Sequence, residues 1–178
     1  MKLVLNNDQI EIIKQHGQAT YPEEGGGLLL GHFDDGRAIV TQIRALPNTW
    51  EGDAERRRRY LIPGKVMLRE TRAADAHGFD VVGTFHSHPD HPAVPSEFDR
   101  DHALPNWSYV IVSVQQGQAG DVAAWQLRED RSAFEAQEIV LGRTPSAALR
   151  GQATKDEPSP LRSRASDEDK TATEVTTR

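Results

Sequence analysis

The chain has 178 residues, which is enough for one domain with its own core and an additional segment. It contains no cysteine, and this excludes disulfides, thiolate metal sites and the zinc deaminases, whose ligands include cysteines. The formal net charge of −6 argues against nucleic acid as a partner. No apolar stretch reaches the roughly 20 residues of a membrane span and no signal-peptide pattern is present, so we expect a soluble, cytoplasmic protein.

The first part of the chain alternates strand and helix patterns. An asparagine at position 6 or 7 is suited to cap the first helix, and the Asp35-Gly36 pair predicts a hairpin turn. Pro63 is suited to the first turn of a later helix. The expected elements are a strand at 2–5, a helix to about 18, strands at 26–32 and 37–45, a polar loop at 46–55, a strand at 59–62, a helix from 63 to about 77, and a strand at 80–85.

The second part of the domain is rich in strand patterns. Three prolines predict an irregular loop before Ser96, which opens a predicted helix. The expected elements are a loop at 88–95, a helix at 96–104, strands at 107–114 and 121–128, and a weaker strand at 134–140. We therefore predict an α/β domain without internal repeats.

The composition changes after about Arg143. The segment 145–178 has no aromatic residue, few large aliphatic residues and equal numbers of acidic and basic side chains. Such a segment cannot bury enough apolar surface to offset the entropy lost on ordering. We predict a folded domain over residues 1–143 and a disordered polar tail over residues 144–178.

Two pairs of polar residues carry the strongest functional signal. His86 and His88 lie two apart at a strand end, so they project from one face with Cα atoms roughly 6.5–7 Å apart. Ser96 and Asp99 lie three apart on a predicted helix and share one face. Two imidazoles and one carboxylate leave the fourth position of a zinc ion free for water, as in catalytic zinc sites. The pattern predicts a metallohydrolase.

Each of these residues also has a purely structural interpretation. A single histidine is more often a hydrogen-bonded structural residue than a ligand. Ser96 alone is a helix N-cap, with Asp99 in the favourable first turn. Taken together, the four residues favour a metal site, because a structural account must explain each one separately. Iron(II), which also binds to two histidines and one carboxylate, stays open as an alternative to zinc.

A second segment supplies candidate bases. Glu23 and Glu24 precede three glycines that lead into an apolar strand pattern. Metal-activated water needs a base that takes its proton and delivers it to the leaving group, and a glutamate beside the metal is suited to this. For either glutamate alone, a solvated position at a helix–strand junction is the simpler interpretation.

The sequence resembles the JAMM (MPN+) metalloprotease family over roughly residues 1–142. The family pattern is an upstream glutamate in an E-x-x-G-apolar segment, followed by H-x-H-P-x6-S-x-x-D. The segment 86–99 matches the second part without gaps, and Glu24 matches the first. The commoner form of the family has a cysteine where this chain has Gly26, a difference that concerns packing rather than chemistry.

The resemblance implies the JAMM/MPN fold, a cytidine-deaminase-like mixed β-sheet flanked by helices. It also implies one zinc ion bound by His86, His88 and Asp99. In the family, the residue that corresponds to Glu24 is the general base and then the acid, and the one that corresponds to Ser96 donates to the oxyanion of the tetrahedral intermediate.

The compact chain looks most like the stand-alone bacterial branch of the family, which resembles sulfur-carrier-protein/cysteine hydrolases. That branch implies a zinc peptidase or isopeptidase that hydrolyses the amide bond after the C-terminal Gly-Gly of a ubiquitin-like or sulfur-carrier protein. A non-catalytic MPN-type binding module for a ubiquitin-like partner stays open as an alternative, as does a metal-dependent protein of DNA repair. The intact site residues argue against the former and the acidic charge against the latter.

Three further features lie near the predicted site. The run Arg56–Arg59 is most simply a solvated basic loop, although the resemblance places this region beside the substrate groove and leaves a docking role open. His91 is expected in an exposed loop and His102 on a helix surface. Contact of either histidine with the substrate or with a metal ligand is the alternative.

Overall fold

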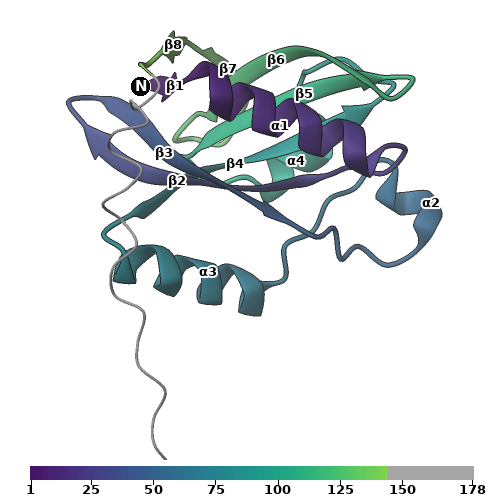
Figure 1. Ribbon diagram of the computed structural model, residues 1–178, viewed down its shortest axis with the longest axis horizontal. Coiled ribbons are helices and arrows are strands. Elements are labelled where there is room, and N and C mark those ends of the chain that lie inside the picture. Colours follow the sequence, from purple (N-terminus) through teal and green to yellow (C-terminus); the bar gives the residue numbers. More distant parts are fainter. Residues whose placement is uncertain (144–178) are drawn as a thin grey trace, which may run out of the picture. The chain divides into compact units, whose positions relative to one another are not determined.

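The predicted strands and helices come together in one curled, mixed β-sheet with helices on both of its faces (Figure 1). The computed structural model describes residues 1–143, and the tail predicted over residues 144–178 lies outside the described residues. The strands are β1 (Lys2–Leu5), β2 (Gly26–Asp34), β3 (Arg37–Leu46), β4 (Asp80–Pro89), β5 (Ser108–Gln115), β6 (Gln118–Leu127), β7 (Phe134–Gln137) and β8 (Ile139–Leu141). The helices are α1 (Asn7–Thr20), α2 (Asp53–Arg56), α3 (Gly64–Ala76) and α4 (Glu97–His102).

The strand order of the sheet is β7-β6-β5-β4-β2-β3-β1-β8. β1 runs parallel to β3 and to β8, β4 runs parallel to β5, and the other neighbours are antiparallel. Only Glu138 separates β7 from β8, although these strands stand at opposite ends of the order. A single residue therefore joins the two edge strands, which requires the sheet to curl back on itself.

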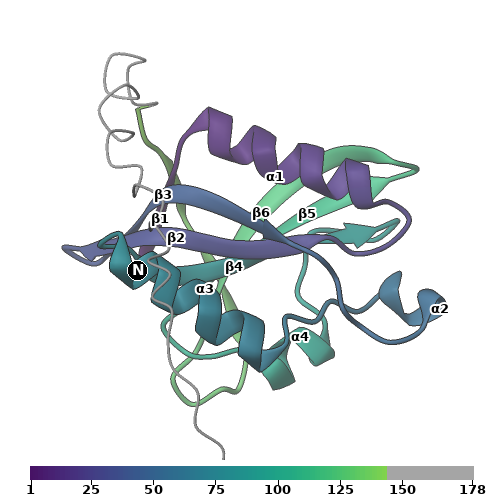
Figure 2. The ribbon, with the colours of Figure 1, turned by 60° about the horizontal axis from the view of Figure 1, so that its bottom comes forward.

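The leucines of β2 alternate between the two faces of the sheet, so both faces are apolar and both are covered by helices. Leu29 belongs to the larger core cluster, which α1 joins through Ile13. Leu28 and Leu30 belong to the second cluster, which α3 joins through Ala74. Figure 2 shows α1 and α3 on opposite sides of β2. None of the described helices has the length and apolar character needed to cross a membrane.

Most of the predicted elements are confirmed, with shifted ends. The hairpin of β2 and β3 turns at the predicted Asp-Gly pair, and Ser96 caps α4. β4 does not end at Phe85 as predicted but continues to Pro89, because residues 86–89 pair with β5. Both candidate histidines therefore lie within the sheet rather than at its end.

The predicted strand at 59–62 is wrong. These residues have no regular structure, and their backbone is hydrogen-bonded to the polar loop before them. The amide of Thr49 donates to the carbonyl of Leu61, and the side chain of Asn48 donates to the carbonyl of Arg59. The same loop contains α2, a helix that the sequence analysis did not predict.

The predicted last strand at 134–140 is two strands. Residues 134–137 pair with β6 at one edge of the sheet, and residues 139–141 pair with β1 at the other. Strand propensity over seven residues does not show where the partner strand changes, because this depends on how the sheet curls.

Candidate metal centre

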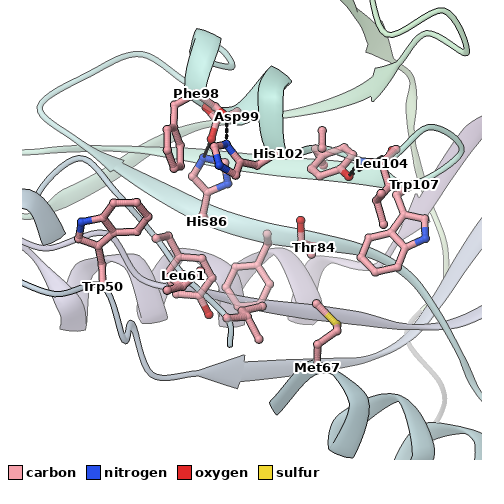
Figure 3. Close-up of a pocket in the computed structure, with 15 residues that line it drawn as sticks. Trp50, Leu61, Met67, Thr84, His86, Phe98, Asp99, His102, Leu104 and Trp107 are labelled. Atoms are coloured by element: carbon pink, nitrogen blue, oxygen red, sulfur yellow. Dashed lines mark hydrogen bonds and ion pairs between the residues drawn. The ribbon is translucent and has the colours of Figure 1, made fainter. Parts of the chain in front are cut away.

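His86 and His88 point from β4 toward Asp99 at the start of α4, and Figure 3 shows His86 and Asp99 facing each other. The two Nε2 atoms lie 2.9 Å apart. Asp99 brings Oδ1 to 3.4 Å from Nε2 of His86 and Oδ2 to 3.7 Å from Nε2 of His88. The structure thus brings together the three residues predicted as ligands, with one candidate ligand atom of each within 4.8 Å of the others.

A main-chain contact at Nδ1 fixes the orientation of the His88 ring. Its Nδ1 lies 3.0 Å from the carbonyl oxygen of Pro92. A carbonyl can only accept, so Nδ1 carries the proton, and in the neutral ring the lone pair of Nε2 faces His86 and Asp99. This is how a histidine that binds a metal is commonly oriented.

Burial and charge set the protonation of the three side chains. Burial lowers the pKa of His86 to about 4, so this ring is neutral at neutral pH. Burial alone would also lower the pKa of His88, but the contact with Asp99, the charges of Glu24 and Asp99 and the hydrogen bond to Pro92 outweigh it and raise that pKa. Burial would raise the pKa of Asp99, yet its contacts with His88, His86 and Ser96 hold it well below its ordinary value. The carboxylate is therefore ionised.

These residues fit a divalent metal ion. The two ring nitrogens, 2.9 Å apart, and the carboxylate of Asp99, 3.4 and 3.7 Å from them, form a compact set of candidate donor atoms. Nitrogen and oxygen donors of this kind suit zinc and other first-row divalent metals.

Ser96 has the structural role that the sequence allowed and also contacts the predicted ligand. Its Oγ accepts from the amide of Asp99 at 3.1 Å, which caps α4. Its own amide and hydroxyl both donate to Oδ2 of Asp99 at 2.7 Å. Ser96 therefore fixes the carboxylate as well as the helix start.

The pairing of β2 with β4 brings Glu24 beside the histidines. Gly26 pairs with His86, and the next residue back, Gly25, exchanges hydrogen bonds with Ser87. The amide of Gly25 donates to Oγ of Ser87 at 2.9 Å, and its carbonyl accepts from the amide of Ser87 at 2.8 Å. A Cβ atom at Gly26 would lie 2.5 Å from a backbone oxygen of β4, so this approach requires glycine.

Glu24 and Glu23 differ sharply in environment. Glu24 is buried, and its burial, reinforced by the charge of Asp99, raises its pKa to about 8 against the opposing charges of His88 and Arg59. It lines one cavity with His88 and Ser96. Glu23 is only half-buried and forms an ion pair with Arg56 at 3.0 Å. The structure thus separates the two candidates, and of the two only Glu24 lines a cavity with one of the candidate ligands.

The sequence analysis missed Asn48, which holds the main chain around the site. Its Nδ2 donates to the carbonyl oxygens of Glu24 at 3.0 Å and Arg59 at 2.7 Å. Its Oδ1 accepts from the amides of Trp50 and Leu61. No motif marks this residue, because its importance arises only when the polar loop folds back on Glu24.

Phe98 anchors α4 and was also missed. Its ring makes an edge contact with Trp50, with ring centroids 5.4 Å apart, and stacks on His102, with centroids 4.0 Å apart. The guanidinium of Arg59 lies 4.4 Å from the centroid of the Phe98 ring. A helix of six residues is too short for its hydrophobic periodicity to reveal such contacts.

Two cavities open beside the metal centre. An apolar cavity of about 380 Å³ lies on one side and is lined by His86, Asp99 and His102, and also by Trp50, Leu61 and Trp107 (Figure 3). The second cavity, also about 380 Å³, is lined by Glu24, His88, Ser96, Arg58, Arg59 and His91. Both histidines that the sequence left undecided thus line a cavity next to the site.

The family described as prokaryotic homologs of the JAB domain matches residues 7–128. The chain belongs to this family. The match contains every site residue discussed above, from Glu24 to Trp107.

Three similar proteins show the extent of the likeness. A "Probable TtuB-protein conjugate cleaving protease" of Thermus thermophilus is 30% identical over 102 residues, 57% of this chain and 64% of that protein. A "Desampylase" of Haloferax volcanii is 34% identical over 93 residues, 52% of this chain and 63% of that protein. The chain thus spans just under two thirds of the length of these relatives. A protein from Salinibacter ruber with a known solution structure is 41% identical, with a TM-score of 0.62 and coverage of 80% of this chain and 92% of that protein.

Proposed function

We propose that this protein is a zinc-dependent peptidase or isopeptidase. Its substrate would be a ubiquitin-like or sulfur-carrier protein, and the amide bond cleaved would be the one after its C-terminal Gly-Gly. The observation that carries the proposal is the convergence of His86, His88 and Asp99 beside the buried Glu24. The names of the two relatives, a conjugate-cleaving protease and a desampylase, support the same kind of reaction.

In this proposal, His86 and His88 hold the zinc ion through Nε2, and Asp99 holds it through its carboxylate. A bound zinc ion would polarise the substrate carbonyl and lower the pKa of its water to about 7. The chain contributes the orientation of the ligands. Pro92 holds the ring of His88, and Ser96 holds the carboxylate of Asp99.

Glu24 is proposed as the proton carrier. Such a group must first accept a proton from the attacking water and then deliver it to the leaving nitrogen. Burial raises the pKa of Glu24 to about 8, near enough to neutral pH for its carboxyl group both to accept and to release a proton. The main chain on both sides of this side chain is fixed, by the carbonyl of Arg56 and by Asn48.

Ser96 is proposed as the donor to the oxyanion of the tetrahedral intermediate. Its hydroxyl lies in the same cavity as Glu24 and donates to Asp99 in this structure, so the role requires that this hydrogen bond be exchanged for one to the substrate. One oriented donor of this kind lowers the barrier by about 3–4 kcal/mol.

A diglycine tail suits the space at the metal centre. Glycine has no side chain, so the tail can lie extended against the sheet while its last carbonyl reaches the ligands. The apolar cavity beside His86 and Asp99 offers room for the residues before the tail.

The proposal is tested with carriers from the same genome that end in Gly-Gly and are extended by a cysteine or a longer peptide. The zinc-loaded protein is expected to remove the extension, and mass spectrometry measures this cleavage. Elemental analysis of protein purified without added metal identifies the ion. Glu24→Gln is expected to keep the metal and abolish cleavage. Glu23→Gln is the matched control and keeps both. Unchanged turnover in Glu24→Gln would refute the assigned base.

A further inference from the structure

The two cavities beside the metal centre differ in chemistry. The cavity that contains His86, Phe98 and His102 is lined mostly by aromatic and aliphatic side chains. The cavity that contains Glu24 and Ser96 also contains the side chains of Arg58 and Arg59. A substrate that crosses the metal centre from one cavity to the other therefore meets an apolar surface on one side and a basic one on the other.

Arg59 is the residue that gives the second cavity its charge. Within residues 1–143, Arg56 forms ion pairs with Glu23 and Asp53, and Arg58 forms one with Glu55, whereas Arg59 forms none. Its guanidinium lies on the ring of Phe98 and donates one hydrogen bond, to the carbonyl of Arg58 at 2.8 Å. The remaining N–H donors of a half-buried guanidinium are thus left without a carboxylate partner.

The position of Glu24 gives the direction of the substrate. The group that protonates the leaving nitrogen must come within hydrogen-bonding distance of it. Glu24 lines the basic cavity and does not line the apolar one. The leaving group therefore enters the basic cavity, and the carrier enters the apolar one.

We propose that Arg59, with Arg58 and His91 at the rim, forms a carboxylate-binding subsite for the leaving group. The inference rests on the proposed function and defines its substrate more narrowly. A carboxylate next to the leaving nitrogen can have two sources. It is the α-carboxylate when a single C-terminal amino acid is removed, and it is an acidic side chain beside the modified lysine when a protein conjugate is cleaved. A planar guanidinium binds either one through two parallel hydrogen bonds.

Two matched pairs of substrates separate these sources. The first pair is a carrier ending in Gly-Gly and one further residue, as the free acid and as the C-terminal amide. The second is a Gly-Gly isopeptide on a lysine flanked by glutamate or by glutamine. For at least one pair, the acidic member is expected to show a KM about tenfold lower at equal kcat, the size of one charge-assisted hydrogen bond.

Substitutions of Arg59 distinguish the effect of its charge from the effect of its contact with Phe98. Arg59→Met has similar length without charge and is expected to abolish the preference, while Arg59→Lys keeps part of it. Arg57→Gln, in the same run but outside both cavities, is expected to keep the preference in full. Elemental analysis of each variant verifies that α4 still presents Asp99 to the metal.

Binding to the metal-free protein distinguishes failure of the subsite from failure of the proposed function. Fluorescence anisotropy with a labelled form of each substrate needs no turnover. If nothing is cleaved but the acidic members bind more tightly and Arg59→Met removes the difference, the subsite stands and the proposed function falls. If the wild-type protein binds the acidic and the neutral members equally, or if Arg59→Met keeps the difference, the subsite is refuted.

Discussion

The proposed metal centre has two halves, which are held in place in different ways. β4 presents His86 and His88 from inside the sheet, where backbone pairing with β5 fixes both residues and pairing with β2 fixes His86. α4 presents Asp99 from a six-residue helix with no buried residue. Its position depends on side-chain contacts, above all those of Phe98 with Trp50, Arg59 and His102. Two of the proposed ligands thus lie in the sheet, and the third is held by contacts of surface side chains. A substitution can therefore weaken the fold without affecting the proposed site, or the reverse.

The largest difference between an effect on the fold and an effect on the proposed site is expected when two phenylalanines are substituted. Phe85 in β4 is 1% exposed and belongs to the main core, so Phe85→Ala is expected to lower the free energy of unfolding by about 3–5 kcal/mol. Phe98→Ala is expected to leave most of that stability intact but to weaken metal binding about 10–100-fold, as the loss of a residue that orients a ligand does. Chemical denaturation and metal titration measure the two effects.

Leu104→Ala is the matched control for Phe98→Ala. Leu104 lines the same apolar cavity and is 50% exposed, but it lies beyond the end of α4. It is expected to leave metal affinity unchanged. Equal loss of metal in both variants would mean that the aromatic cluster does not hold Asp99 in place.

A smaller effect is expected from Asn48, which lies in neither half but holds the main chain of Glu24 and Arg59. Asn48→Ala removes the donors to the carbonyls of Glu24 and Arg59 and is expected to cost about 1–3 kcal/mol of stability. Because both histidines and Asp99 are untouched, metal content is expected to stay at the wild-type level. A displaced Glu24 is expected to lower kcat about 10–100-fold.

Thr49→Ala provides the comparison for Asn48→Ala. Thr49 is the next residue in the loop, and its hydroxyl makes one exposed hydrogen bond, to the carbonyl of Leu61. Its loss is expected to change neither kcat nor metal content. If Asn48→Ala lost metal and kcat together, Asn48 would be holding the proposed ligands in place as well as the proposed base.

The contrast between local patterns and contacts distant in the sequence explains what the sequence could predict. The candidate ligands on β4 and α4 follow from the spacing H-x-H and S-x-x-D, because strand and helix periodicity place such residues on one face. The α/β class, the hairpin and the capping of α4 by Ser96 likewise depend on local pattern. Asn48, Arg59 and the failed strand at 59–62 depend on where a polar loop folds in space. That position is set by hydrogen bonds between residues far apart in the sequence.

The choice between Glu23 and Glu24 shows where a local pattern is not enough. Both carboxylates precede the same glycines, and the resemblance to a family, not periodicity, favoured Glu24. The structure separates the two residues by burial, because Glu24 directly precedes Gly25, which is hydrogen-bonded to Ser87 of β4, whereas Glu23 forms an ion pair with Arg56.

The smallest effect is expected at Glu70, which links α3 to the sheet far from either half of the site. Its buried carboxylate accepts from Arg44 at 2.9 Å and from Arg69 at 2.7 Å. The hydrogen bond from Arg69, helped by Arg44, holds the pKa of Glu70 below its ordinary value. A carboxyl group with a lowered pKa in the folded state stabilises the fold fully above its unfolded pKa of about 4.3. That contribution is lost as the pH falls through the lower, folded pKa.

Glu70→Gln is therefore expected to be less stable than the wild-type protein at pH 7, with a difference that shrinks on acidification below about pH 4.3. Denaturation with urea at a series of pH values measures it. Glu11→Gln, at an exposed position on α1, is the control and is expected to show no such trend. Metal affinity and kcat at pH 7 are expected to be unchanged, because Glu70 lines neither cavity beside the ligands. A stability difference that instead grew toward low pH would contradict the ion-paired state of Glu70. A loss of metal at pH 7 would show that α3 takes part in holding the site, and the division into two halves would then be too simple.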